Sequence, residues 1–280
     1  MPTVPKLRRA LLQAIGVTAA ILCAPAAAWP EEATIGGTGG ALGLARALGA
    51  DFSAASPADN LKVLPSLGST GAMRALLDGA IDLGLSARPL EPAEAARGAR
   101  EVACVRTPLA FVSSLESARA IEVARLPALF ADPRPTWPDG SPLRIILRTR
   151  LDADTNYLIS VVPGLSAAVE AARRRPESPS AATDQDNMEL AAMVPGSLTQ
   201  ATLVQLVTEG IKLRVLAVNG IMPSVETLES GRYPLVRRLC IIAGQSVSGV
   251  AQRFVSHVLS QRGASILRES GGLPTPVSAR

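Results

Sequence analysis

Gly36-Gly37-Thr38-Gly39-Gly40 follows a short strand-like run and opens an Ala- and Leu-rich, helix-like run. A second turn of the same kind, Gly68-Ser69-Thr70-Gly71, also stands between a strand pattern and a helix pattern. Turns like these leave several backbone N–H groups without partners at a helix start, and the helix dipole adds positive potential there. Two such turns in one sheet can converge on one small ligand. We therefore expect an anion-binding site built from both.

The order of patterns along the chain predicts the fold class. Strand-like and helix-like runs alternate over the 280 residues, which is typical of an α/β protein with a largely parallel sheet. The alternation stops in a proline-rich stretch at residues 127–138 and then restarts. Two long extended runs, residues 101–113 and 233–243, flank the restarted block. We predict two lobes, each a mostly parallel sheet flanked by helices, joined by a hinge of two crossing strands.

The domain boundaries follow from these two runs. We predict a signal peptide over residues 1–28, a first lobe over residues 29–112 plus 238–280, and a second lobe over residues 113–237. The second long run returns the chain to the first lobe, which the last helices then complete. The later helix patterns cover residues 155–173 with a break at Pro163-Gly164, residues 183–193 with Thr183 as the cap, and residues 247–269 with a break near Gly263.

The amino terminus has the composition of a secretory signal peptide. Its parts are a basic start (Lys6, Arg8, Arg9), an apolar segment too short to span a membrane (residues 10–22), and a small-residue cleavage site (Ala26-Ala27-Ala28). Cys23 leaves a lipid anchor open, although Leu22 stands where lipoprotein processing needs a small residue. We expect cleavage after Ala28, a periplasmic mature protein, and no membrane insertion after cleavage.

The net charge of the chain lies mostly in that leader. Removing residues 1–28 takes away three of the 28 Lys and Arg residues and none of the 24 acidic ones, which leaves 25 basic against 24 acidic side chains. A chain so nearly neutral loses the main electrostatic support for nucleic-acid binding. We expect no nucleic-acid partner.

Two cysteines, Cys104 and Cys240, remain after the leader is removed. Neither belongs to a CxxC or CxxH metal-binding pattern, so we expect no metal site. Both fall in the proposed crossing segments, which would put them on neighbouring strands of the first lobe. An oxidising compartment allows a disulfide between them. We slightly favour two buried thiols.

Several short motifs, taken in order, resemble the periplasmic phosphate-type substrate-binding proteins of ABC transporters. The matching pieces are Ile35 to Gly40, Ser66 to Gly71, Asp82 to Leu90, Leu126 to Phe130, Trp137-Pro138-Asp139-Gly140, Arg148, Val194 to Leu198, Asn219 to Ser224, and Gly231 to Leu235. The resemblance covers nearly all of the mature chain. It implies a type II periplasmic binding protein fold, a ligand cleft between two lobes, and ligand capture by hinge closure. It also implies no cofactor, a monomer, and an inner-membrane ABC transporter permease or a sensor as partner.

The resemblance suggests the following ligand-binding residues: Thr38, Gly39, Gly40, Ser69, Thr70, Gly71, Arg88, Arg148 and Thr155. The chain departs from the family in two places. Ala87 followed by Arg88 replaces an acidic residue that usually follows the third strand, and Asp152-Ala153-Asp154 replaces the expected Ser-Gly-Thr. Asp154 could cap the helix while Asp152 pairs with Arg148 or Arg150. If the carboxylates instead face the cleft, phosphate should bind poorly, and a neutral or cation-bearing ligand is favoured.

Catalytic readings of the sequence are weak, and we expect no catalytic residues. The first glycine turn lacks the third glycine of a dinucleotide turn, because Leu42 stands there, and it lacks the ending of a P-loop. Residues 244–249 only approach a nucleophile elbow, and His257 is the one histidine available for a triad. Three hypotheses remain: a solute-binding protein that captures phosphate or a related oxyanion for an ABC transporter, a binding or sensing module of the same fold with another ligand, and, least favoured, a small hydrolase or transferase.

Overall fold

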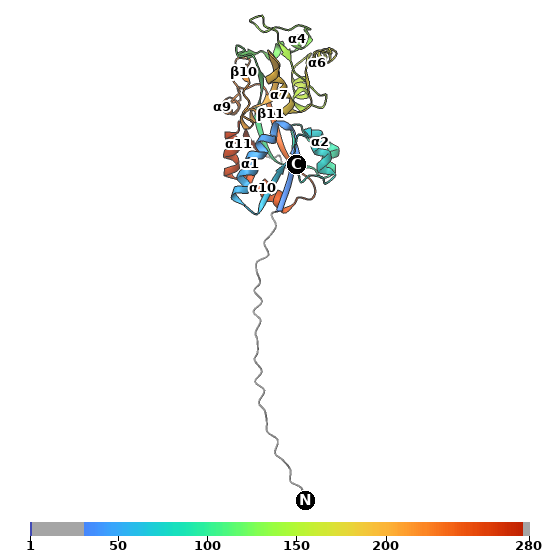
Figure 1. Cartoon of the computed structure of the whole chain (residues 1–280), viewed down its shortest axis with the longest axis vertical. Helices are drawn as coiled ribbons and strands as arrows, with labels where there is room; N and C mark the ends of the chain where they lie inside the picture. Colours follow the sequence, from blue (N-terminus) through green and yellow to red (C-terminus); the bar gives the residue numbers. More distant parts are fainter. Residues whose placement is uncertain (2–30, 277–280) are drawn as a thin grey trace.

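The structure, a computed structural model, describes Met1 and residues 31–276. The signal peptide and its cleavage site therefore lie outside the described residues. Among the residues described, no helix is both long and apolar enough to cross a bilayer. Figure 1 shows two bodies of mixed α/β structure, with α1, α2, α10 and α11 in one and α4, α6 and β10 in the other.

Seven of the described strands form one continuous hydrogen-bonded path. Its order is β2 (Asp59–Val63), β1 (Glu31–Gly37), β3 (Leu83–Ser86), β11 (Val236–Ala243), β4 (Arg100–Ser113), β10 (Arg214–Val218) and β5 (Ala120–Ile121). Three further strands join it, namely β6 (Arg144–Ile145), β9 (Ser197–Thr202) and β12 (Leu273–Thr275), while β7 (Leu147–Arg148) pairs with β8 (Ser180–Ala181). The pairing is parallel between β1 and its neighbours but antiparallel wherever β4 or β11 pairs with another strand.

The long strand β4 links the two halves. Its first part pairs with β11 and its last residues pair with β9 and β10. The predicted α/β fold class is confirmed, and the structure adds two features to it: hydrogen bonding continues from one half to the other through β4, and the hinge strands are antiparallel to their neighbours. The reason is geometric, because a strand that returns the chain to the first half runs against the strand that left it.

The helices cover both halves. They are α1 (Leu42–Ala55), α2 (Gly68–Leu77), α3 (Pro92–Ala96), α4 (Leu126–Ala131), α5 (Ala153–Val161), α6 (Leu165–Arg173), α7 (Asp184–Met193), α8 (Leu203–Thr208), α9 (Val225–Glu229), α10 (Gly249–Val258) and α11 (Gln261–Glu269). Short 3-10 turns lie at Gly39–Ala41 and Val123–Arg125. The break between α5 and α6 and the Thr183 cap of α7 are as predicted. The last break lies at Leu259-Ser260 rather than near Gly263, because the Ser260 hydroxyl accepts from the Gly263 N–H and caps α11.

Two large hydrophobic cores define the halves. The first combines residues 33–105 with residues 239–267 and Val204, so α10 and α11 pack beside β1 and α1. The second draws on residues 109–235. We call the parts around these cores the first lobe and the second lobe. Boundaries at residues 112/113 and 237/238 remain a prediction.

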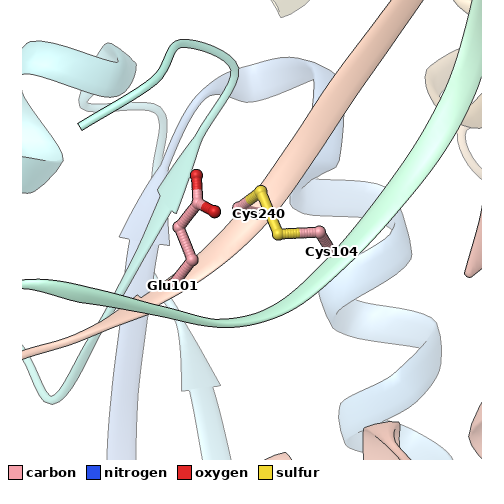
Figure 2. A group of neighbouring side chains, drawn as sticks. All are labelled: Glu101, Cys104 and Cys240. Atoms are coloured by element: carbon pink, nitrogen blue, oxygen red, sulfur yellow. A yellow bond between two sulfur atoms is a disulfide. The ribbon is translucent and has the colours of Figure 1, made fainter. Parts of the chain in front are cut away.

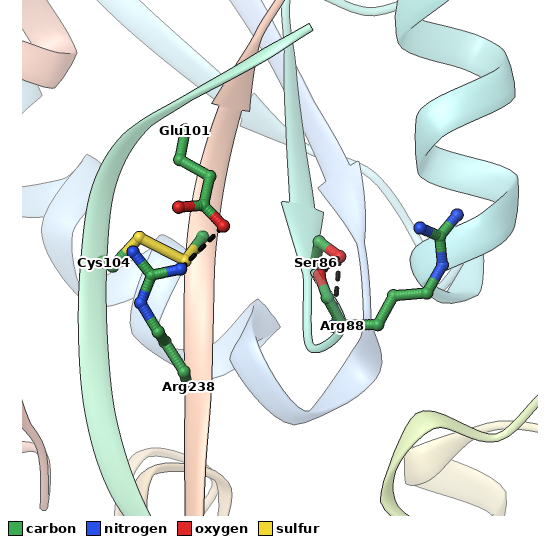
Figure 3. Close-up of a disulfide and its surroundings, with 6 residues drawn as sticks. Ser86, Arg88, Glu101, Cys104 and Arg238 are labelled. Carbon is green, nitrogen blue, oxygen red and sulfur yellow. Dashed lines mark hydrogen bonds and ion pairs between the residues drawn. A yellow bond between two sulfur atoms is a disulfide. The ribbon is translucent and has the colours of Figure 1, made fainter. Parts of the chain in front are cut away.

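Cys104 and Cys240 form a disulfide, with Cα atoms 4.1 Å apart. The two residues lie directly opposite each other on β4 and β11, and Figure 3 shows the bond between these strands. The predicted neighbouring positions are therefore correct, whereas the preference for free thiols is wrong. Antiparallel register places the two Cβ atoms side by side, and the order of residues alone does not reveal that register.

Candidate ligand-binding cleft

A polar cleft of about 330 Å³ lies between the two lobes. The first lobe contributes the turn after β1 and the amino end of α2, and the second contributes the segments after β7 and β8. Of the predicted site residues, those that line it are Thr38, Ser69, Thr70, Gly71 and Arg148. All four residues of the second glycine turn line this cavity, whereas of the first turn Thr38 lines it and the predicted residues Gly39 and Gly40 do not.

The amino end of α2 is the open anion-favouring element of this cleft. The helix starts at Gly68 and so includes the glycine turn itself, and no side chain caps it. The first N–H groups of a helix have no partner within it, so those of residues 68–70 remain available to a ligand. The Ser69 hydroxyl accepts the Ala87 N–H at 3.0 Å and fixes α2 against the end of β3.

Arg148 is buried at the end of β7, with 6% of its surface exposed. Its Nη1 donates to Asp184 Oδ1 at 2.8 Å, and its Nη2 lies 3.2 Å from Asp152 Oδ1. Its Nε is buried and has no hydrogen-bond partner among the described residues. Burial alone would lower the pKa of Arg148, but the charges of Asp152 and Asp184 raise it above its ordinary value. The guanidinium that the sequence suggests for a ligand is thus already paired with carboxylates.

Asp184, at the start of α7, reaches across to the first lobe. Its Oδ2 accepts the Gly40 N–H at 2.8 Å and lies 3.5 Å from the Thr38 hydroxyl. The first glycine turn therefore does hold an anion, and that anion is a side chain of the protein. The lobes meet closely here, since a Cβ atom on Gly39 would lie 2.7 Å from Asp184 Oδ2. Gly39 and Gly40 therefore serve this contact between the lobes.

The Asp152-Ala153-Asp154 segment opens α5. Asp152 is its N-cap and accepts the Thr155 N–H at 2.8 Å and the Thr155 hydroxyl at 2.7 Å, while Gln200 Nε2 donates to the same hydroxyl at 3.0 Å. Thr155 is buried in this network and does not line the cleft. The suggestion that Asp154 caps the helix is wrong, because Asp152 both caps it and pairs with Arg148.

Asp154 instead pairs with Arg237 of β11, whose Nε donates to Asp154 Oδ1 at 2.7 Å. Arg237 also donates to the Ala87 carbonyl of the first lobe and stacks over Tyr157, its Cζ 4.6 Å from the ring centroid. Burial raises the pKa of Asp154 to about 6; Arg237 opposes this shift, and the charges of Asp152 and Asp184 add to it. Three carboxylates and two guanidiniums thus share the interlobe region.

Arg88 lies away from this cleft. Its Nη1 and Nη2 donate to the two oxygens of Glu94 at 2.9 and 2.6 Å, and it lines a neighbouring groove of about 550 Å³. Figure 3 shows its side chain extending away from Ser86 and from the disulfide. Of the other predicted site residues, Thr70 also lines this groove, and the rest do not line it. Its bidentate pairing with Glu94 is a contact within one lobe.

A group of possible metal ligands lies at the hinge. Glu101 is close to Cys104 and Cys240, as Figure 2 shows. The two sulfur atoms are bonded to each other, and Glu101 Oε1 accepts from Arg238 Nη1 at 2.6 Å. In this state the sulfurs offer no thiolate to a metal ion.

Sequence reasoning missed Asp184, which lines the cleft, and Arg237, which lines the neighbouring groove and connects Asp154 to the Ala87 carbonyl. For Asp184 a partial signal exists, because Thr183 is a predicted helix cap and Asp184 follows it in the first turn of that helix. The strand β8 just before it is a finding of the structure, and ligands of α/β proteins contact that edge of a sheet. For Arg237 no such signal exists, because it lies within a long extended run.

The fold and the cleft define a class, the type II periplasmic binding proteins. The chain matches the family model described as the PBP superfamily domain over residues 24–262, and it belongs to this superfamily. No curated protein is similar enough in sequence to count as a relative.

Solved structures with the same fold include three anion receptors. One, from Clostridium perfringens, is described as a phosphate ABC transporter substrate-binding protein with bound phosphate (12% identity, TM-score 0.74, covering 88% of this chain and 100% of that one). The second is an ABC-type phosphate transport receptor from Vibrio cholerae (13% identity, TM-score 0.60, covering 88% of this chain and 100% of that one). The third is a periplasmic molybdate-binding protein from Azotobacter vinelandii (15% identity, TM-score 0.57, covering 87% of this chain and 99% of that one). At these identities the likeness concerns the fold.

Proposed function

We propose that this chain is an exported solute-binding protein that encloses a small solute carrying an anionic group and delivers it to an ABC transporter permease. The observation that carries the proposal is the uncapped amino end of α2, which opens onto the interlobe cleft. The superfamily membership supports the role, and the anions bound by the structural neighbours support an anionic group on the ligand.

The solute's anionic group would bind at α2. There it meets the free N–H groups of the first turn, the Thr70 side chain, and Arg74 at the exposed rim of the same cleft. The rest of the solute would face the second lobe. Closure of the lobes about β4 and β11 would then enclose it.

We propose a binding role without catalysis. The single histidine, His257, lies on α10, with Nε2 3.1 Å from Asp51 and its ring 5.7 Å from that of Phe52, and it does not line the cleft. A serine nucleophile in the cleft would therefore have no histidine base beside it.

A thermal-shift screen with phosphate, sulfate, molybdate, organic acids and amino acids tests this proposal. A true ligand at about 100 times its Kd adds about 2.7 kcal/mol to the free energy of unfolding and raises the melting temperature. Thr70→Asp should abolish that increase, because a carboxylate at the amino end of α2 repels the solute. A carboxylate at the amino end of a helix interacts favourably with the helix dipole, so the unliganded protein should melt at the same or a slightly higher temperature.

Thr70→Ser is the matched control, since it keeps the hydroxyl and adds no charge. It should retain most of the ligand-induced shift. A shift of equal size in Thr70→Asp would refute binding at α2, and the absence of any shift across the panel would refute a solute-binding role for such ligands.

A further inference from the structure

We propose that Asp184 is a specificity-determining residue whose carboxylate fills the position of a free tetrahedral oxyanion between the lobes and so excludes inorganic phosphate. This inference rests on the proposed function for the identity of the cleft. It narrows the class of ligand to a solute whose only anionic group is the one that binds at the amino end of α2.

The donors around Asp184 are those that would hold an oxyanion. They are a backbone N–H at a glycine turn (Gly40, 2.8 Å), a hydroxyl (Thr38, 3.5 Å) and a buried guanidinium (Arg148, 2.8 Å). The first two belong to the first lobe and the third to the second lobe, as in a ligand gripped from both sides. A carboxylate and a phosphate oxygen make the same kind of charge-assisted bond to such donors.

The charge of the region opposes a second anion at this place. The other nitrogen of the Arg148 fork, Nη2, already faces Asp152, and Asp154 is paired with Arg237. Inserting a phosphate beside Asp184 would add like charge to a buried cluster in which carboxylates already outnumber guanidiniums. Such repulsion is strong where water is excluded.

The same geometry defines the chemical class of the ligand. An anionic group has a favourable place only at α2, whereas the group that approaches Asp184 and Asp152 must be neutral or positively charged. Free phosphate, sulfate and molybdate are anionic on every side and do not meet this condition.

Removing the Asp184 carboxylate should convert the cleft into an oxyanion site. Asp184→Ser would release the Gly40 N–H, the Thr38 hydroxyl and one nitrogen of Arg148. The helix should still form, because its cap is the Thr183 hydroxyl, which accepts the Asp186 N–H at 3.0 Å. Glu189→Gln is the matched control, since it removes one negative charge from an exposed position of the same helix.

Isothermal titration calorimetry with inorganic phosphate, at constant ionic strength, tests the proposal on the wild type and both variants. We expect the wild type and Glu189→Gln to bind with a Kd of about 1 mM or weaker. Asp184→Ser should bind about 10- to 100-fold more tightly, because a charge-assisted hydrogen bond to phosphate is restored. Far-ultraviolet circular dichroism checks that each protein is folded. If Asp184→Ser does not fold, the nearly isosteric Asp184→Asn takes its place, and it too should bind phosphate more tightly than the wild type does.

Micromolar phosphate binding by the wild type would overturn the proposal, and so would a folded Asp184 variant that binds phosphate no better than the wild type. These outcomes are separate from the failure of the proposed function. If no solute in the screen stabilises the wild type while Asp184→Ser gains phosphate binding, the solute-binding role fails and the assignment of Asp184 stands.

Discussion

Asp154 is a buried carboxylate whose charge should change with pH near 6. Its pKa is about 6 in the folded protein, mainly because of burial, against 3.8 as its ordinary value. The folded state therefore holds the proton more tightly than the unfolded state does. By linkage, the contribution of Asp154 to the free energy of unfolding is largest below about pH 4 and falls as pH rises to about 6, by up to about 3 kcal/mol.

Chemical denaturation of the wild type and Asp154→Asn at pH values from 4 to 7 measures this effect. The wild-type free energy minus that of the variant should decrease as pH rises, since the titrations common to both proteins cancel. A difference that grows with pH would mean that Arg237 outweighs burial and holds the pKa of Asp154 below its ordinary value.

At the same scale, the sequence predicts the donors of the cleft better than their partners. Arg148 and both glycine turns follow from local patterns, because a strand end and a helix start are visible in a few consecutive residues. The partner of Gly40 is Asp184, 144 positions along the chain. Which carboxylate of a polar segment reaches another lobe depends on tertiary packing, and local pattern does not encode it.

Among the elements, β4 and β11 are joined by the Cys104–Cys240 disulfide across a separation of 136 residues. A cross-link that closes so long a loop restricts the unfolded chain, and removal of such a bond typically costs about 2–5 kcal/mol. The double variant Cys104→Ser/Cys240→Ser should therefore lose stability of that order in urea denaturation. The wild type under reducing conditions is the control, and its free energy of unfolding should fall by a similar amount. If the oxidised and the reduced wild type are equally stable, the prediction is contradicted.

The extended runs that became β4 and β11 are clear from the sequence, because long apolar segments without helical spacing are strands. Their antiparallel register and the continuity of the sheet through β4 are not. Periodicity shows which face of a strand is buried, whereas register depends on the neighbouring strand.

For the molecule as a whole, we predict export with cleavage after Ala28. Mass spectrometry of the periplasmic fraction should find a chain that begins at Trp29, because a basic, apolar and small-residue order is what signal peptidase reads. Ala26→Lys/Ala28→Lys should block the cleavage and leave the leader attached. Recovery of an intact chain starting at Met1 from the cytoplasm alone would contradict export.

The two cores differ in how they are distributed along the chain, and we expect this difference to influence the order of folding. The second core uses residues 109–235, whereas the first needs residues 239–267 to cover β1 and α1. A chain made from its amino terminus completes every residue of the second core before Leu239 exists. Until then the apolar side chains of residues 33–105 lack the helices that cover them, α10 and α11, and remain accessible to chaperones and proteases. We therefore expect the second lobe to fold first, and the lobe that is made first to be the last to close.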